Sequence, residues 1–144
     1  MKIDRIVVGI DGSQNSDRAA EVAADLAELS GAEIIAVHAI GLLEDLTKAG
    51  LAPAERRLEV LRQLETGWTD PLRRTGIPVR CEIRDGHPVD ALLSVIDEVE
   101  ADLLVVGSRG LSTFPTQLLG STSAQVARLT PCPMVLVPDR QRVT

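Results

Sequence analysis

Aromatic residues are almost absent from this sequence of 144 residues, which contains one Phe, one Trp and no Tyr. Proteins that bind RNA or single-stranded DNA usually stack the bases on aromatic side chains, and that platform is missing here. A formal net charge of −6 also opposes binding to a polyanion. We therefore expect no nucleic-acid partner and a core built from aliphatic side chains.

Long apolar runs are lacking as well. No stretch approaches the roughly 18 consecutive residues that a membrane span requires, and the opening segment Met1 to Arg5 has no apolar signal-peptide core. These features predict no membrane association and a soluble, cytoplasmic protein. With 44% hydrophobic and 25% charged residues, we expect one domain over residues 1–144, with its core at 1–138 and a loose tail at 139–144.

Metal-binding patterns are also missing. Cys81 and Cys132 lie far apart and form no Cys-x-x-Cys pair, so two buried, reduced thiols are expected. His38 and His87 stand at no zinc-site spacing from these cysteines, which predicts no structural metal. We expect His38 to pack against a neighbour and His87 to be structural at a helix start.

What the chain does contain is a regular alternation of short apolar runs and amphipathic segments. Apolar runs at 6–10, 34–37 and 103–106 predict buried strands, and the apolar run 134–137 predicts a last strand. The alternating segment 79–83 predicts a strand at or near a sheet edge. Helical spacing predicts helices over 13–31, 53–76, 88–99 and 121–129, with Ser13 and Ser16 as candidate N-caps and Gly31 as the C-cap. Helix residues expected on the apolar stripes include Leu29, Leu58 and Trp68. This order predicts an α/β fold with a doubly wound, five-stranded parallel sheet.

The most informative segment is the loop that leaves the fourth strand at Gly107 and reaches the last helix at Ser121. In open parallel sheets, ligands bind outside the carboxyl ends of the strands. A helix N-terminus with unpaired N–H groups favours a phosphate there. Gly110 and Gly120 let the backbone turn and approach a bulky anion without a Cβ clash, and Ser121 and Thr122 supply hydroxyl groups.

Each candidate also has a structural alternative. Ser121 and Thr122 are suited to capping the helix, although the surrounding glycines favour phosphate binding. Arg109, the loop's only cation, serves a phosphate, a partner subunit or a solvated surface. Asp11 ends the first strand and contacts either ribose or a Mg²⁺ that bridges the phosphates, or it closes an Asx-turn or caps the next helix. We favour the ligand for Asp11 and a cap for Ser13.

The common phosphate motifs are absent, because neither Gly-Lys-Ser/Thr nor a G-x-G-x-x-G after the first strand occurs. Gly107, Gly110, Gly120 and Ser121 instead satisfy the spacing G-x2-G-x9-G-(S/T). With this spacing the chain resembles the ATP-binding branch of the universal stress protein family. Segments 6–13, 37–39, 102–110 and 131–138 also resemble the strands of that family, so the resemblance covers essentially the whole chain.

This resemblance implies an adenine nucleotide alpha hydrolase-like sheet of order 3-2-1-4-5 that binds ATP. It implies adenine and ribose near the ends of the first, second and fourth strands, and phosphates along the glycine loop. The implied ligand set is Gly9, Ile10, Asp11, Ala39 and Gly107 for the nucleoside and Gly110, Gly120, Ser121 and Thr122 for the phosphates. Arg109 is a tenth candidate ligand, and the Mg²⁺ contact assigned to Asp11 comes from its place after the first strand.

The function that follows is an ATP-binding stress-response switch with at most slow ATP hydrolysis, since fast phosphoryl transfer needs a positioned base and a strong electrostatic clamp. The alternative is a nucleotide-free dimeric scaffold of the same family. A flavin or dinucleotide protein is disfavoured, because its glycine motif and aromatic side chains are missing. The apolar last strand, Met134 to Val137, is expected at a sheet edge, and the resemblance implies a homodimer through its antiparallel pairing.

Overall fold

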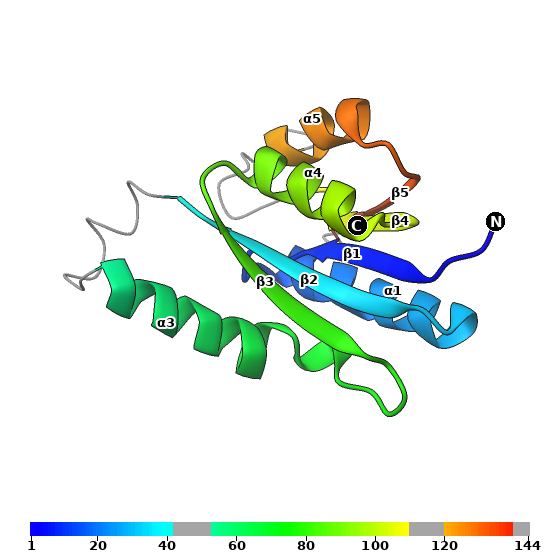
Figure 1. Ribbon diagram of the computed structural model, residues 1–144, viewed down its shortest axis with the longest axis horizontal. Coiled ribbons are helices and arrows are strands. Elements are labelled where there is room, and N and C mark those ends of the chain that lie inside the picture. Colours follow the sequence, from blue (N-terminus) through cyan, green and yellow to red (C-terminus); the bar gives the residue numbers. More distant parts are fainter. Residues whose placement is uncertain (42–52, 110–119, 140–144) are drawn as a thin grey trace, which may run out of the picture.

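Five strands form one parallel sheet in the computed structural model, which describes residues 1–41, 53–109 and 120–139 (Figure 1). They are β1 (Arg5–Gly9), β2 (Glu33–Ile40), β3 (Val79–Asp85), β4 (Leu103–Gly107) and β5 (Met134–Val137). Their order in the sheet is β3-β2-β1-β4-β5, with every pair parallel. The expected doubly wound topology is confirmed, and β3 and β5 are the two edges. Residues 140–144 of the expected tail lie outside the described residues.

Helices cover both faces of this sheet (Figure 1). They are α1 (Gln14–Ser30), α3 (Pro53–Gln63), the π-helix η1 (Leu64–Trp68), the 3-10 helix η2 (Asp70–Leu72), α4 (Pro88–Val99) and α5 (Ser121–Leu129). Ile6 and Val8 of β1 belong to the aliphatic cluster that α1 covers, and Val7 belongs to the cluster under α4 and α5. The central strands are therefore buried on both sides, which explains why they are continuous apolar runs.

Helix ends follow the predicted capping chemistry. Ser13 is the N-cap of α1, and its Oγ accepts a hydrogen bond from the Ser16 N–H at 3.1 Å. Gly31 ends the same helix in the left-handed conformation with φ of 77°. His87 caps α4, where its Nδ1 accepts from the Val89 N–H at 3.2 Å, so the structural role expected for this residue is confirmed.

The predicted continuous helix over 53–76 is wrong. The α-helix ends at Gln63 and continues as the wider η1 and then the tighter η2. Gly67 lies in η1, and Pro71 lies in η2, where its ring and missing N–H are incompatible with an α-helix interior. Because these two weak helix formers lie within five positions, a π-helix and a 3-10 helix take the place of the last predicted α-helical turns.

Two apolar side chains that were expected to face the core are exposed. Leu29 of α1 is 85% exposed and Leu58 of α3 is 67% exposed. The buried stripe of α1 consists of alanines, from Ala19 to Ala27, because the helix packs closely on the sheet. Cys81 and Cys132 are half-buried, so the expectation of fully buried thiols is also wrong.

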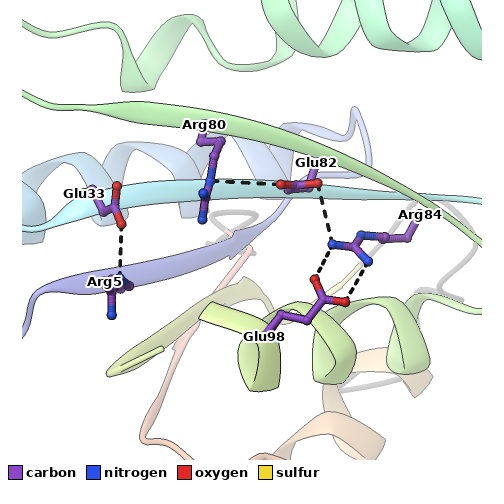
Figure 2. A network of polar contacts seen from close by, with 6 residues as sticks. All are labelled: Arg5, Glu33, Arg80, Glu82, Arg84 and Glu98. Carbon is purple, nitrogen blue, oxygen red and sulfur yellow. Dashed lines mark hydrogen bonds and ion pairs between the residues drawn. The ribbon is translucent and has the colours of Figure 1, made fainter. Parts of the chain in front are cut away.

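The edge strand β3 separates its charged and apolar residues between the two faces of the sheet. Figure 2 shows Arg80, Glu82 and Arg84 on one face, where Arg84 forms a two-pronged ion pair with Glu98 of α4 at 2.6 and 3.0 Å. The Arg84 guanidinium, through its hydrogen bonds, lowers the pKa of Glu98. On the opposite face, the alternate residues of β3 pack against the α1 cluster. The alternating sequence therefore identified an edge strand with one solvated face.

Among the helices that the structure describes, none has both the length and the apolar content that crossing a membrane requires.

Candidate nucleotide-binding site

A pocket of about 280 Å³ lies at the carboxyl ends of β1, β2 and β4. This is where the sheet changes its winding direction, and ligands of open α/β sheets bind at that point. The structure brings nine of the ten proposed ligand residues into its lining. These are Gly9, Ile10, Asp11, Ala39, Gly107, Arg109, Gly120, Ser121 and Thr122. The tenth, Gly110, lies outside the described residues.

The sequence interpretation missed about half of the lining. Val37 and Val106 lie in the carboxyl-terminal halves of β2 and β4, and they could have been found from their position in those strands. Pro88, Ala91 and Leu92 come from the first turns of α4, which follows β3 and so begins at the same edge of the sheet. The remaining residues that were missed are Ser16, His38 and Ser123.

Apolar side chains of β4 and α4 pack around Gly9 at the floor of the pocket. A Cβ added to Gly9 would lie 3.3 Å from Cγ1 of Val106 and 3.5 Å from Cδ2 of Leu92. Leu92 and Val106 are both about 5% exposed. The floor is therefore apolar, closely packed and preformed, as is usual for the part of a site that holds a ring system.

Two hydrogen bonds hold the two described ends of the glycine loop together, and a third holds the first end against β5. The Gly120 N–H donates to the Ser108 carbonyl at 2.6 Å, and the Ser108 N–H donates to the Val137 carbonyl at 2.9 Å. The Ser123 hydroxyl donates to the Gly107 carbonyl at 2.7 Å. The N-terminus of α5 is consequently fixed beside the end of β4, and its first-turn N–H groups and hydroxyls border the pocket.

Gly120 does not use the conformational freedom of glycine. It has φ of −65° and ψ of 154°, which any residue adopts, so the predicted turning role is wrong at this position. Gly120 is nevertheless buried and lines the pocket. The close-approach part of its predicted role stays a prediction.

Asn15 is a buried residue that the sequence interpretation did not single out. Its Nδ2 donates to the Val137 carbonyl at 3.1 Å, and its Oδ1 accepts from the Arg109 N–H at 2.8 Å. The side chain is in close contact with Gly107, whose added Cβ would lie 2.8 Å from Cγ and Oδ1 of Asn15. Only the folded structure reveals these contacts, because the partners lie far from Asn15 in the sequence.

The structural alternative for Asp11 is present in the structure. Its Oδ1 accepts from the Ser13 N–H at 2.9 Å, which closes an Asx-turn before α1. Asp11 also lines the pocket, so the turn orients a carboxylate beside the ligand space. Burial, and then the carboxylates of Glu21, Asp11 and Asp70, raise the pKa of Asp17. Among the described residues that line the pocket, Asp11 is the acidic one.

His38 is held by the backbone and by the only tryptophan. Its Nδ1 lies 2.7 Å from the Ile10 carbonyl, which can only accept, so Nδ1 carries the proton. The His38 and Trp68 rings are 5.0 Å apart and tilted by 56°. Trp68 is half-buried against the α1 cluster and also contacts Gly12. The expected packing roles of His38 and Trp68 are confirmed.

Comparison with known proteins agrees with this fold. The model of the universal stress protein family matches residues 2–138. A universal stress protein of Thermus aquaticus is 36% identical over 135 residues, which cover 92% of this chain and 96% of that protein. Three longer universal stress proteins, from Mycobacterium bovis and Mycobacterium tuberculosis, are 36% identical over 140 residues, and the chain spans 43% of each.

Two solved structures extend the comparison. The crystal structure of a universal stress protein in complex with cAMP has 34% identity and a TM-score of 0.74, covering 95% of this chain and 98% of that one. The universal stress protein from Archaeoglobus fulgidus in complex with dAMP has 24% identity and a TM-score of 0.70, covering 95% and 99%, and it supports the fold alone. From its sequence and its fold, the chain is a member of the universal stress protein family.

Proposed function

We propose that this chain binds ATP with Mg²⁺ in the pocket at the carboxyl ends of β1, β2 and β4, and that nucleotide binding makes it a stress-response switch. The observation that carries the proposal is the division of the pocket into an apolar floor and a polar rim at a helix N-terminus. The similar universal stress protein solved with cAMP supports an adenine nucleotide as the ligand class.

The floor suits the nucleoside. Ile10, Val37, Leu92 and Val106 provide apolar contacts for the faces of an adenine ring. Backbone groups at the ends of β1 and β2, next to Asp11 and Ala39, can hydrogen-bond the edge of the base and the ribose. We assign the nucleoside to this side of the pocket.

The rim beside α5 suits the phosphates. The first-turn N–H groups of a helix lack intrahelical acceptors and carry partial positive charge. Ser121 is exposed and Thr122 is half-buried, and both place hydroxyl groups at this helix start. Arg109 also lines the pocket and supplies the positive charge of a side chain.

A nucleotide-bound Mg²⁺ fits beside Asp11, the acidic side chain among the described pocket residues. A phosphate beside the carboxylate of Asp11 would be repelled without a cation between them. Asp11 is the residue we propose to contact the ion, and a carboxylate is a preferred Mg²⁺ ligand. Bound Mg²⁺ would neutralise phosphate charge and orient the phosphate chain.

Binding, with at most slow hydrolysis, is the proposed output. The titratable side chains among the described pocket residues are Asp11, His38 and Arg109. Asp11 is committed to the Asx-turn through one oxygen, and His38 is held through Nδ1 by the Ile10 carbonyl. Fast phosphoryl transfer requires a nucleophile oriented by a base that is set in line with the γ-phosphate. The described residues support tight binding better than rapid turnover.

We also propose that β5 pairs with the same strand of a second copy. Its outer edge presents backbone groups that no further strand of the described sheet covers, and Leu136 is 38% exposed beside them. Antiparallel pairing across a two-fold axis would extend the sheet into an isologous dimer. Light scattering after size-exclusion chromatography should give the dimer mass at micromolar concentration, and a monomer mass would contradict this pairing.

The nucleotide proposal is tested by release and by thermal shift. Denatured protein should release ATP or ADP onto an anion-exchange column. Protein stripped of nucleotide should gain about 2.7 kcal/mol at 100 times the Kd of ATP–Mg²⁺, which raises the Tm by about 5 to 10 °C for a chain of this size. If the wild-type protein releases no nucleotide and its Tm does not change with ATP–Mg²⁺, the nucleotide-free scaffold is favoured instead.

Ser121→Ala tests whether the phosphates of ATP bind at the rim beside α5. Loss of one hydrogen bond to a charged phosphate costs about 1.5–3 kcal/mol, so ATP affinity should fall about 10- to 100-fold. Ser94→Ala, at an exposed serine of α4 that does not line the pocket, is the matched control and should bind as the wild type does.

A further inference from the structure

The amide side chain of Asn15 joins three parts of the molecule that are separate in the sequence. It belongs to the first turn of α1, it donates to the carbonyl of Val137 in β5, and it accepts from the N–H of Arg109 just after β4. Asn15 is 5% exposed. The backbone of the glycine loop therefore leaves β4 against a buried polar clamp.

The clamp requires a donor and an acceptor on one short side chain. An asparagine amide provides both, with two N–H donors and a carbonyl oxygen. Both bonded atoms are placed at ordinary hydrogen-bond distances, 3.1 Å to Val137 and 2.8 Å to Arg109. A glycine at position 107 leaves the room that the amide occupies, since an added Cβ would lie 2.8 Å from it. Asn15 and Gly107 are thus sterically matched.

The bond to Arg109 acts where the loop leaves the sheet. Gly107 is still paired with Val137 in the β4–β5 ladder, and the Ser108 N–H still donates to the Val137 carbonyl. Arg109 is the next residue, and its backbone N–H is bonded to Asn15. The clamp therefore determines the direction in which the chain departs from β4 beside the pocket.

We infer that Asn15 is a positioning residue for the phosphate side of the pocket, acting through the backbone of Arg109. The inference rests on the proposed function, because it requires a phosphate-bearing ligand there. Asn15 does not line the pocket itself. Its loss should weaken the binding of phosphates and leave the nucleoside side, on the floor made by β1, β2 and α4, unchanged.

Asn15→Ala tests this split by calorimetric titration of the stripped protein with ATP–Mg²⁺ and, separately, with adenosine. Affinity for ATP should fall about 3- to 10-fold, the change that corresponds to the loss of about one ordinary hydrogen bond. Affinity for adenosine should stay within twofold of the wild type. Ser94→Ala should change neither affinity.

Amide hydrogen exchange separates positioning from a general loss of stability. In Asn15→Ala the Arg109 amide should lose protection, while the Ser108 amide, which donates to Val137, should keep it. General destabilisation would accelerate both amides together. Asn15→Asp is the second variant, because it is isosteric and retains an acceptor for the Arg109 N–H. Its Arg109 amide should stay protected even if the alanine variant folds poorly.

The outcomes separate this inference from the proposed function. If wild-type protein binds neither ATP nor adenosine, both are overturned. If the wild type binds ATP and Asn15→Ala binds it equally well, or loses ATP and adenosine affinity to the same extent, the positioning role alone is overturned. An unprotected Arg109 amide in Asn15→Asp would also overturn it.

Discussion

Gly107→Ala is expected to destabilise the fold even without any ligand. A Cβ at this position would lie 2.8 Å from Cγ and Oδ1 of Asn15 and 3.1 Å from the Asn15 backbone oxygen. Real Cβ atoms do not approach so closely, so either the amide or the backbone must move. The amide cannot move cheaply, because it is buried and bonded to both Val137 and Arg109.

The size of the effect follows from these contacts. Displacing the amide breaks two hydrogen bonds, each worth about 0.5–1.5 kcal/mol. Forcing an extra methyl group into a packed site adds about 1–3 kcal/mol. We expect Gly107→Ala to lower the free energy of unfolding by about 2–6 kcal/mol, which lowers the Tm by about 5 to 20 °C.

Urea unfolding of nucleotide-stripped protein measures the effect, since a bound ligand would add its own stabilisation. Gly67→Ala is the matched control. A Cβ there meets nothing within 4 Å, and replacing a helical glycine should stabilise by up to about 1 kcal/mol. Gly107→Ala should also cost less in an Asn15→Ala background, because the clashing amide is gone. A loss below about 0.5 kcal/mol, or an equal loss in both backgrounds, would refute the reasoning.

Two further predictions concern caps and acid sensitivity. Ser13→Ala should lower the unfolding free energy by about 1 kcal/mol, with an unchanged urea m-value, because the Ser16 N–H loses its capping acceptor. The N–H groups of Asp4 and Arg5 donate to Asp102 Oδ2 and hold the pKa of Asp102 below its usual range. Because the pKa of Asp102 is lower in the folded than in the unfolded state, the ionised carboxylate stabilises the fold above about pH 4. This stabilisation is lost as the pH falls through the pKa of the folded state. The unfolding free energy should therefore fall less steeply in acid for Asp102→Asn than for the wild type, and parallel pH profiles would contradict this.

Local sequence features were sufficient for most of the fold. Apolar runs marked the three buried strands β1, β2 and β4 and the edge strand β5, alternation marked the edge strand β3, and Ser13 and Gly31 marked the two ends of α1. The sheet order required the family resemblance, because apolar runs do not say which strands are neighbours. The failure between Gln63 and Leu72 has a local cause, since Gly67 and Pro71 weaken an α-helix without specifying the π and 3-10 turns that replace it.

The site was predicted less completely for a different reason. Residues at the ends of β1 and β4 follow from the topology rule for open parallel sheets. Asn15 does not, because its partners Arg109 and Val137 lie 94 and 122 positions away in the sequence. Its residue type carries no signal either, since asparagine near a helix start usually indicates a cap. Only packing of α1 against β4 and β5 gives this amide its role.

The physical requirement for glycine therefore differs between positions 107 and 120 of the loop pattern. Gly107 is required by the neighbouring Asn15, whether or not a nucleotide binds, so its presence argues for a well-packed fold and not for a ligand. Gly120 has ordinary backbone angles, and nothing in its conformation requires glycine. If a closely bound phosphate is what requires glycine at position 120, the residues that point to a ligand are those at the start of α5. Substitutions at Ser121 consequently test nucleotide binding more directly than substitutions at the glycines, whose effects on folding and binding would be mixed.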